Sequence, residues 1–410
     1  MGGGPAGATA ALDIRKEDKE GEITLISDED YQFYKRSKIL NLISTSCSED
    51  DLFLKGKSVY DENKIKFIND HVEKVIPENN QILLKSGQRI HYDHLLIASG
   101  GSPILLPWKG VELDGIYPLY KLDDAKKVAE KVCNTDRVVI IGGGAIAMKA
   151  IQNFKKIGLE ISIIEKASHM WPIGFDRKVA RIVEQKIIEN GIHIYLNEEV
   201  VEFQGENGKL NSVILKSGRV INTDLVVITI GMKPNIDFLI GSGVKVEKGI
   251  LVNSYMRTNI ENIYAAGDVA QIYDPLYNSP ILHPTWGNAK RQGKIAARNM
   301  LGDNIKYDGT IPIQTIKIFD FTAIAVGITH SKKNFDEISW ISYQKGLCRK
   351  FVLENDHLLG ALILGKKINK KSIKPILKKA IFNMAHINEY KHLLLKEDID
   401  FNNLLIDLNW

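Results

Sequence analysis

Glycine residues and one glutamate near the middle of the chain have the types and spacing that bind a dinucleotide. The apolar run 137–141 ends at Gly142, and Gly144 follows, so the backbone can turn tightly and approach a pyrophosphate. The charge of that pyrophosphate is stabilised by the free N–H groups at the start of the next helix. Glu165 follows a second apolar run, about 20 residues after the glycines, where an acid binds ribose hydroxyls. The stretch 137–165 therefore predicts a strand, a helix and a strand that bind a dinucleotide.

The same glutamate predicts which coenzyme is bound. A carboxylate that accepts hydrogen bonds from the adenosine ribose repels a 2′-phosphate, so NADH is favoured over NADPH. The third glycine of the motif is here Ala147, which is a tolerated substitute. Because both strands, the helix and the acid are in register, we interpret the motif as a nucleotide site rather than as a glycine-rich structural turn.

A second glycine motif opens the chain and is incomplete. All three glycine positions are filled, and two adjacent acids follow a helical segment and an apolar run, so either acid could bind a ribose. The strand that should precede the motif is missing, which indicates a start codon assigned too late, a truncated chain or an imperfectly bound first nucleotide. The glycines are Gly2, Gly4 and Gly7, and the acids are Asp28 and Glu29. Two nucleotides are therefore expected.

The rest of the chain predicts an α/β protein. Apolar strands alternate with helices until Gly309, after which alternating apolar residues predict a small mixed domain closed by two amphipathic helices. A strand within 262–270 delivers Asp268 at its carboxyl end, where an acid can bind a ribityl chain. The predicted helices include 123–131, 176–190 and 286–301, and the predicted strands include 193–196, 223–230, 313–318, 323–328, 338–343, 349–353 and 358–364.

The composition describes an ordinary soluble globular protein. The 410 residues are 44% hydrophobic and 25% charged, and no apolar run approaches the length of a membrane span. No signal peptide opens the chain, so a cytoplasmic location and no membrane association are predicted. Cys47, Cys133 and Cys348 lack the spacing of a metal site or a redox-active disulfide, so no metal is predicted.

Basic residues are concentrated between Ser331 and Ala380. Twelve lysines and arginines in this stretch are opposed by four acids. Such a region could steer an acidic protein partner by long-range attraction, or it could be a solvated face; no nucleic-acid partner is predicted. The basic residues are Lys332, Lys333, Lys345, Arg349, Lys350, Lys366, Lys367, Lys370, Lys371, Lys374, Lys378 and Lys379.

Together these motifs resemble the FAD-dependent pyridine-nucleotide oxidoreductases. The similar branch holds ferredoxin reductases of oxygenases, NADH:rubredoxin reductases and the flavin domain of nitrite reductases. Four segments carry the resemblance: the first glycine motif, DHLLIASG at 93–100, the turn at 230–234 and NIYAAGDVA at 262–270. Disulfide reductases and peroxidases of this superfamily carry redox cysteines that are absent here, and YKRS at 34–37 is similar to the YxRP segment of the electron-transfer reductases.

The resemblance implies which residues contact the cofactors. Trp286, within TWGNAKRQG, is expected to lie against the isoalloxazine on the side facing an iron–sulfur partner, with simple core packing as the alternative. The implied FAD contacts are Gly2, Gly4, Pro5, Ala6, Gly7, Asp28, Glu29, Arg36, Val75, Ala98, Ser99, Gly100, Gly267, Asp268, Trp286 and Gln292. The implied NAD contacts are Gly142, Gly144, Ala145, Ile146, Glu165 and Gly231.

Two positions depart from the family pattern. Lys149 stands where family members usually have a glutamate near the nicotinamide, and this reversal of charge bears on nicotinamide placement and turnover. The family's lysine near the flavin falls on Asn41 in ungapped register, with Lys38 as a possible substitute. Trp286, Lys38 and Lys149 are therefore the candidate residues near the reacting rings.

The resemblance implies a fold and a reaction. The expected fold is α/β, with two Rossmann-like nucleotide-binding domains and a small α+β interface domain. The expected enzyme passes electrons from NADH through FAD to a small acidic iron protein such as rubredoxin or ferredoxin, as a monomer or homodimer. The alternatives are a nitrite reductase flavin subunit or NADH oxidase, and a flavin-binding scaffold or sensor with impaired NADH turnover. The expected boundaries are 1–105 and 236–305 for FAD, 106–235 for NAD(P)H and 306–410 for the interface domain.

Overall fold

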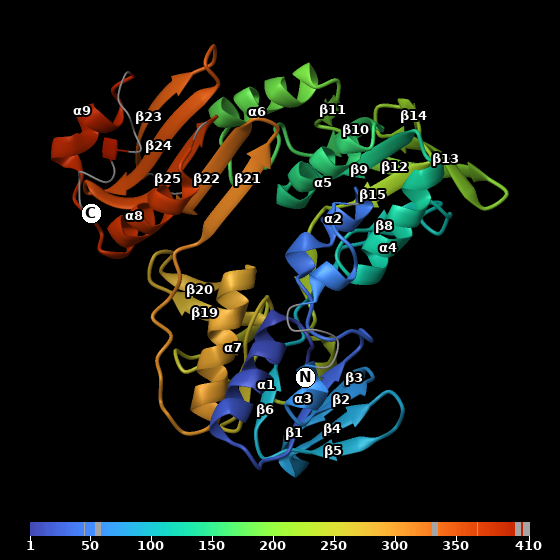
Figure 1. The fold of residues 1–410 in the computed structure, drawn as a ribbon, viewed down its shortest axis with the longest axis vertical. Helices are drawn as coiled ribbons and strands as arrows, with labels where there is room; N and C mark the ends of the chain where they lie inside the picture. Colours follow the sequence, from blue (N-terminus) through green and yellow to red (C-terminus); the bar gives the residue numbers. More distant parts are fainter. Residues whose placement is uncertain (45, 54–58, 330–334, 367, 398–402, 405–410) are drawn as a thin grey trace. The chain divides into compact units, whose positions relative to one another are not determined.

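The computed structural model describes residues 1–44, 46–53, 59–329, 335–366, 368–397 and 403–404. The chain divides into two compact units, each built from separate stretches of sequence (Figure 1). The first unit comprises Met1–Lys38, Cys47–Ser102 and Met232–Thr310, and the second comprises Ile39–Ser46, Pro103–Gly231 and Ile311–Trp410. The boundaries expected for three domains remain a prediction.

A five-stranded parallel sheet forms the centre of one half of the second unit. Its strand order is β11-β10-β9-β15-β8, and β9 and β15 are buried almost throughout, as expected of strands covered on both faces. The predicted strand, helix and strand of the central glycine motif are confirmed. The elements are α2 (Leu40–Ile43), β8 (Ile116–Pro118), α4 (Leu122–Lys131), β9 (Arg137–Ile141), α5 (Ala145–Lys156), β10 (Glu160–Glu165), α6 (Arg177–Glu189), β11 (His193–Leu196), β12 (Val200–Glu206), β13 (Lys209–Leu215), β14 (Val220–Asn222) and β15 (Leu225–Ile228).

A five-stranded antiparallel sheet forms the other half of the second unit. Its order is β21-β22-β25-β24-β23, and α8 packs on β22 and β25 (Figure 1). All five strands predicted in this region are confirmed, although β22, β24 and β25 are buried on consecutive residues rather than on every second one. The elements are β21 (Ile313–Ile318), β22 (Phe321–Gly327), β23 (Asp336–Ser342), β24 (Leu347–Glu354), β25 (His357–Gly365), α8 (Lys370–Phe382) and α9 (Lys391–Leu394).

The first unit is built from short sheets and two long helices. The unit contains the parallel pairs β1-β2 and β6-β18, the antiparallel sheet β3-β4-β5 and the mixed sheet β17-β19-β20, in which β17 and β19 are parallel; β7 pairs with β16. Helices α1 and α7 pack side by side (Figure 1). The elements are α1 (Pro5–Glu17), β1 (Ile23–Ser27), α3 (Val59–Glu62), β2 (Ile65–Asn69), β3 (Val72–Ile76), β4 (Gln81–Leu84), β5 (Arg89–His91), β6 (Leu95–Ile97), β7 (Gly101–Pro103), β16 (Met232–Pro234), β17 (Ile250–Val252), β18 (Ile263–Ala265), β19 (Ala270–Asp274), β20 (Ser279–Leu282) and α7 (Trp286–Met300).

Met1 and Gly2 connect the two parallel pairs of the first unit. The Met1 ammonium donates to the carbonyl oxygen of Leu96 at 2.7 Å, and the Ala98 N–H donates to Met1 O at 2.9 Å. On the other side the Gly2 N–H donates to Ile26 O at 2.7 Å. The two residues therefore make the hydrogen bonds expected of the last step of a strand between β1 and β6. Burial lowers the pKa of the Met1 ammonium to about 5.

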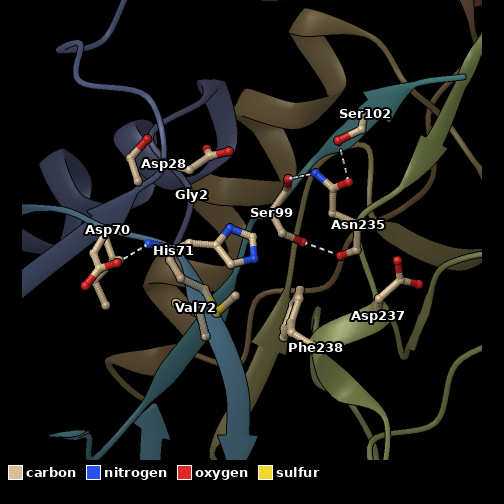
Figure 2. Close-up of a pocket in the computed structure, with 13 residues that line it drawn as sticks. Gly2, Asp28, Asp70, His71, Val72, Ser99, Ser102, Asn235, Asp237 and Phe238 are labelled. Carbon is tan, nitrogen blue, oxygen red and sulfur yellow. Dashed lines mark hydrogen bonds between the residues drawn. The ribbon is translucent and has the colours of Figure 1, made fainter. Parts of the chain in front are cut away.

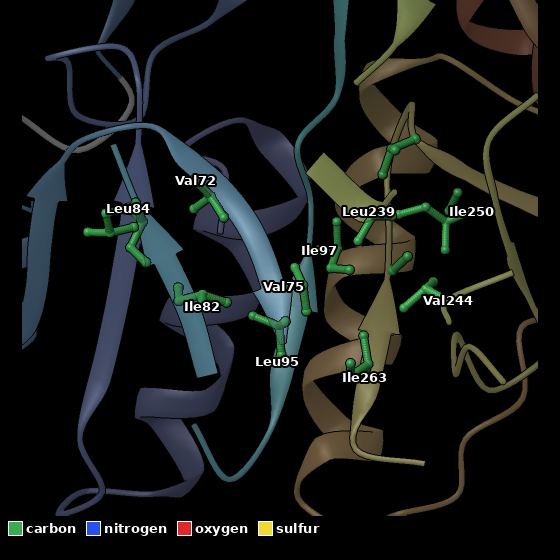
Figure 3. Packing of buried hydrophobic residues seen from close by; sticks show 14 residues of the cluster. Val72, Val75, Ile82, Leu84, Leu95, Ile97, Leu239, Val244, Ile250 and Ile263 are labelled. Atoms are coloured by element: carbon green, nitrogen blue, oxygen red, sulfur yellow. The ribbon is translucent and has the colours of Figure 1, made fainter. Parts of the chain in front are cut away.

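An apolar core joins the sheets of the first unit (Figure 3). Val75 from β3, Ile82 from β4 and Ile97 from β6 meet Ile263 from β18, and each is at most 4% exposed. Burial of such side chains is the main stabilising contribution of this region, at about 25 cal/mol per Å² of apolar surface. The core thereby holds the carboxyl end of β6 in place behind the first glycine turn.

Gly293 permits the close contact between α7 and α1. A β-carbon at this position would lie 2.3 Å from Ala6 O, so Gly293→Ala is expected to lower the thermal unfolding midpoint, by an amount equivalent to about 1–3 kcal/mol. The control is Gly287→Ala in the same helix, because its β-carbon position has no atom within 4 Å. That variant is expected to keep or raise the midpoint, since alanine favours helix. Equal losses in both variants would contradict this account of the contact.

Candidate nucleotide-binding sites

The first glycine turn lies at the start of α1. Gly2 has a φ of +104°, and a β-carbon there would lie 2.0 Å from the carbonyl oxygen of Ala98, so only glycine fits. A β-carbon on Gly7 would lie equally close, 2.0 Å, to Gly2 O. Gly4 caps the helix without a side-chain hydrogen bond, and nothing lies within 4 Å of its β-carbon position. The helix therefore begins at Pro5 with uncapped N–H groups beside open space, which fits a phosphate group.

A cavity of about 180 Å³ opens beside this turn (Figure 2). Three of the residues implied for FAD line it, and they come from different parts of the chain: Gly2, Asp28 and Ser99. The structure adds polar and aromatic residues that no motif indicated, because they are brought there by the fold of β3 and of the segment after β16. These added residues include Asp70, His71, Ser102, Asn235, Asp237 and Phe238.

Asn235 holds the segment that follows β6. Its side-chain amide donates to Ser99 O at 3.0 Å, and the Ser99 hydroxyl donates to Asn235 O at 2.8 Å. The Ser102 hydroxyl donates to Asn235 Oδ1 at 2.8 Å (Figure 2). Gly100, in the same segment, has a φ of +61°. Sequence reasoning identified the turn at 230–234 but not Asn235, although its place directly after that turn was a usable signal.

Hydrogen-bond register distinguishes the acids near the first turn. Gly2 N–H donates to Ile26 O at 2.7 Å, and in the second unit Gly142 N–H donates to Ile164 O at 2.8 Å. Ser27 therefore lies where Glu165 lies in the second turn, and Asp28, one residue later, lines the cavity.

Glu29 has other partners. Its carboxylate forms an ion pair with Arg36 and accepts a hydrogen bond from the Tyr34 hydroxyl at 2.6 Å. The Arg36 guanidinium also lies 5.2 Å from the centre of the Tyr34 ring. Of the two acids that the sequence left open, Asp28 is therefore the one at the cavity, while Glu29 orients Arg36.

Asp268 lies in the tight turn that follows β18. Gly267 has a φ of +86°, and its N–H donates to Gln292 Oε1 at 2.9 Å. Gln292 is fully buried, so it positions the turn from behind. Burial raises the pKa of Asp268 to about 6, and the Arg36 guanidinium opposes this shift. A desolvated carboxylate is stabilised when a ligand hydroxyl donates a hydrogen bond to it. The ribityl chain of FAD has such hydroxyls. Contact between these residues and FAD stays a prediction.

The other residues predicted near FAD include exposed, stacked and buried side chains. Trp286 is the first residue of α7, and its ring is stacked on Phe33 with centroids 5.5 Å apart and planes inclined by 8°. Lys38 is solvent-exposed at the end of a short 3-10 helix. Val75 points into the core, so only its backbone is available to a ligand. Ala6 and Ala98 are also buried, and they shape the turn from behind.

The second glycine turn lies between β9 and α5. Gly142 has a φ of +97°, and a β-carbon there would lie 2.8 Å from Thr229 O. Gly144 caps α5 without a side-chain bond and has an open β-carbon position, as Gly4 does. The Glu165 carboxylate accepts hydrogen bonds from Gly143 N–H at 2.6 Å and from Ala167 N–H at 2.7 Å. The structure therefore brings the predicted glycines and the acid together in a form that fits a dinucleotide.

The remaining NAD candidates lie around this turn. Ala145 and Ile146 form the first turn of α5, and Gly231 has a φ of +121° in the turn after β15. Ala147 is fully buried, which agrees with its role as a small substitute for glycine. Lys149 is one helical turn further along α5; its side chain retains solvent-exposed surface, yet desolvation of the ammonium lowers its pKa.

Two of the three thiols are not activated. Burial raises the pKa of Cys47, and it raises that of Cys348 to about 12, so neither thiol is favoured as a thiolate. Within the described ranges of the chain, no three His, Cys, Asp or Glu side chains are grouped to hold a metal ion. None of the described helices is long and apolar enough to cross a membrane.

The fold and the two glycine turns define a protein of the class that binds two dinucleotides for redox chemistry. The chain belongs to the pyridine nucleotide-disulphide oxidoreductase family, which it matches over residues 1–306. It is 31% identical to an NADH-rubredoxin oxidoreductase of Clostridium acetobutylicum over 90% of this chain and 92% of that protein. The crystal structure of an NADH:rubredoxin oxidoreductase from the same organism covers all of this chain and 98% of its own, at 28% identity and a TM-score of 0.79.

Two further comparisons concern a longer protein and a complex with a partner. An assimilatory nitrate reductase electron transfer subunit of Bacillus subtilis is 26% identical over 91% of this chain, which spans only 48% of that protein. A covalent putidaredoxin reductase–putidaredoxin complex shares the fold, with a TM-score of 0.90 at 23% identity over 99% of this chain and 97% of its own. These comparisons confirm the predicted family, its reductase branch and the α/β fold. They also confirm the prediction of an oxidoreductase that uses FAD and NADH.

Glu165 is expected to set the preference for NADH. Glu165→Ala removes the carboxylate that braces the glycine loop and repels a 2′-phosphate, so the ratio of kcat/KM for NADH to that for NADPH is expected to fall about tenfold or more. The matched control is Glu160→Ala, at the exposed start of the same strand, which is expected to leave the ratio unchanged. Steady-state kinetics with both coenzymes provide the measurement. An unchanged ratio in the Glu165 variant would remove this residue from coenzyme selection.

Proposed function

We propose that this chain is an FAD-dependent reductase that takes electrons from NADH and passes them to a small iron protein such as rubredoxin or ferredoxin. The observation that carries the proposal is the repeated glycine turn. Each turn has a glycine at positive φ against the carbonyl after a parallel strand, and each helix has an uncapped glycine N-terminus. Two such turns in one chain, together with the raised pKa values of the Cys47 and Cys348 thiols, suit two bound nucleotides and an external electron acceptor.

The residues of the first unit would hold FAD. Gly2, Gly4 and Gly7 leave room for the pyrophosphate, and Asp28 would accept hydrogen bonds from the adenosine ribose. Asp268 would accept a hydrogen bond from the ribityl chain, which relieves the cost of its burial. When bound, FAD supplies the exchange between a two-electron donor and a one-electron acceptor.

The residues of the second unit would hold NADH. Gly142 and Gly144 would receive its pyrophosphate at the start of α5, and Glu165 would bind the adenosine ribose. Transfer of a hydride between two rings requires contact and orientation rather than an acid, a base or a nucleophile. The chain's contribution is therefore to bind, orient and desolvate the two rings.

Two alternatives follow from specific observations. The Bacillus subtilis relatives named nitrite reductase [NAD(P)H] and nitrate reductase electron transfer subunit are about twice as long as this chain, which favours a role as the flavin part of a larger assembly. Lys149, with its lowered pKa close to the second glycine turn, favours a flavin-binding scaffold with impaired NADH turnover. The expected cytoplasmic location and the expected monomer or homodimer remain predictions.

Anaerobic stopped-flow reduction by NADH distinguishes these functions. We expect rapid bleaching of the bound flavin by NADH, slower bleaching by NADPH, and reoxidation when oxidised rubredoxin is added. Lys149→Glu is expected to change the bleaching rate by less than about tenfold, because hydride transfer needs no charged group at that position. A wild type that binds FAD but is not bleached, and a Lys149→Glu variant that is bleached, would replace the reductase proposal with the scaffold.

Helix α8 is the proposed contact for an acidic partner. It contains five lysines and no acid, and Lys371, Lys378 and Lys379 are solvent-exposed. Other members of the basic region have different surroundings, since Lys366 pairs with Asp320 at 3.1 Å. Lys332, Lys333 and Lys367 lie outside the described residues.

Charge reversal on α8 tests this contact. The double variant Lys371→Glu, Lys378→Glu is expected to lower the second-order rate of rubredoxin reduction about tenfold at low ionic strength, with the difference shrinking as salt is added. The rate of flavin bleaching by NADH should stay unchanged. The control reverses Lys74 and Lys85, which are exposed on β3 and in the turn that follows β4 in the first unit. Similar rates and salt dependences for both double variants would remove α8 from the docking surface.

A further inference from the structure

A fully buried lysine lies in the middle of the antiparallel sheet of the second unit. Lys350 is on β24 between β23 and β25, and its side chain is only 2% exposed. Its neighbours on the strand include Cys348, Phe351 and Val352, all buried. A lysine in such a strand is costly unless its charge is paired, so its presence needs a specific reason.

The partners of Lys350 are two carboxylates from different parts of the second unit. Its ammonium lies 2.6 Å from Asp176 Oδ2 and 2.9 Å from Glu337 Oε1. Burial alone would lower the pKa of Lys350, but these two hydrogen bonds raise it above its ordinary value, so the lysine is charged. Glu337 belongs to the neighbouring strand β23, whereas Asp176 belongs to the loop before α6. The pair of Lys350 with Asp176 therefore connects the antiparallel sheet to the coenzyme half of the unit.

Asp176 is the N-cap of α6. Its Oδ1 atom accepts a hydrogen bond from Val179 N–H at 3.0 Å, while Oδ2 contacts Lys350. Helix α6 packs against β11 of the parallel sheet and against β21 of the antiparallel sheet (Figure 1). Both oxygens of this carboxylate therefore have partners: Oδ1 caps the helix, and Oδ2 ties the start of the helix to the antiparallel sheet.

The loop between β10 and Asp176 reaches the second glycine turn. Trp171 N–H donates to Gly143 O at 3.0 Å, and Gly143 N–H donates to Glu165. Trp171 has a φ of +49°, a conformation that a tryptophan keeps only when its surroundings enforce it.

Three contacts enforce this conformation of Trp171. Its carbonyl accepts hydrogen bonds from Gly174 N–H at 3.0 Å and Phe175 N–H at 2.9 Å. Its ring meets the Phe175 ring with centroids 4.6 Å apart, and Gly174 leaves the space that the indole occupies. The loop is therefore a compact clasp, residues 166–176, with one end on the glycine turn and the other on Lys350.

The segment that follows β22 holds this clasp at a second point. The Thr329 hydroxyl, which is buried, donates to Gly174 O at 3.2 Å. The clasp is therefore attached to the C-terminal half of the second unit through both Asp176 and Gly174. A lone lysine on the surface would not do this, because its flexible side chain loses entropy for little gain.

We propose that Lys350 is a positioning residue for NADH binding: through Asp176 it holds the 166–176 clasp against Gly143, and so preserves the glycine turn that receives the coenzyme. This inference rests on the proposed function in one respect, namely that NADH binds at Gly142 to Gly144. It adds that the C-terminal antiparallel sheet contributes directly to coenzyme affinity. The expected effect is on Kd and KM for NADH, with little effect on kcat.

The test compares Lys350→Met with Lys345→Met in the FAD-loaded protein. Methionine keeps much of the lysine volume without the charge, and Lys345 is an exposed lysine at the adjoining turn, paired with Glu397. Lys350→Met is expected to raise the NADH Kd about tenfold, the size of a coupling within one hydrogen-bond network, and Lys345→Met to leave it unchanged. Hydrogen exchange followed by mass spectrometry should show faster exchange in peptides covering 166–176 for Lys350→Met alone.

A second pair of variants keeps the proposal testable if Lys350→Met folds poorly. Asp176→Asn retains an N-cap residue and removes the charge partner, so it should reproduce the loss of NADH affinity with little loss of helix stability. The double variant should lose no more affinity than the worse single variant, since both act through one pair. Unchanged Kd and unchanged exchange of the clasp in folded variants would overturn the proposal. If wild type binds no NADH, the proposed function fails, and exchange of the clasp alone then decides whether Lys350 holds it.

Discussion

The two glycine turns bring backbone segments so close together that only glycine fits between them, and the rest of the structure depends on this close approach. At each turn the N–H of a glycine bonds the carbonyl of one neighbouring strand, while the carbonyl of the residue before it accepts an N–H from the other. The distances are 2.7 and 2.9 Å around Gly2 and 2.8 Å for both bonds around Gly142. No side chain fits at either position. Each following helix is capped by a glycine, Gly4 or Gly144, so its first N–H groups have no side-chain partner at the cap. The parallel strands, the helices and the acids are arranged around that requirement.

The two glycine turns are held by equivalent backbone hydrogen bonds. In the second unit Ile141 ends a strand, β9, that pairs with β10 and β15 on either side. In the first unit the Met1 carbonyl accepts the equivalent hydrogen bond from the Ala98 N–H. The position of Gly2 therefore depends on β1 and β6, which are held by their own cores. The apolar cluster behind β6 supplies that support (Figure 3).

Most of the fold was predictable because local patterns and long-range packing agree. Alternation gave all five strands of the antiparallel sheet, and apolar runs between glycines gave β9 and β10. The acids were less predictable, because spacing alone cannot separate adjacent residues: Asp28 and Glu29 looked equivalent, and the structure separates them through the ion pair of Glu29 with Arg36. His71 reaches the first cavity only through tertiary folding, so no local pattern marked it, whereas the place of Asn235 directly after the predicted turn at 230–234 was a usable signal. Lys350 looked like one member of a basic surface, and only its burial shows otherwise.

Two carboxylates with a desolvation cost differ in whether other groups of the fold offset that cost. Burial alone would raise the pKa of Asp176, but Lys350 and the Val179 N–H reverse the shift, so this carboxylate is stabilised within the fold. Asp268 is different: burial raises its pKa to about 6, and Arg36 opposes the shift only in part. A carboxylate that remains costly in the folded chain gains the most from a ligand that donates hydrogen bonds to it. The same reasoning applies to the uncapped helix starts at Gly4 and Gly144, where hydrogen-bonding capacity is left for a bound group. The fold therefore satisfies the charged pair of Asp176 and Lys350 within the second unit, whereas Asp268 and the two helix starts retain the hydrogen-bonding capacity that the proposed cofactors would use.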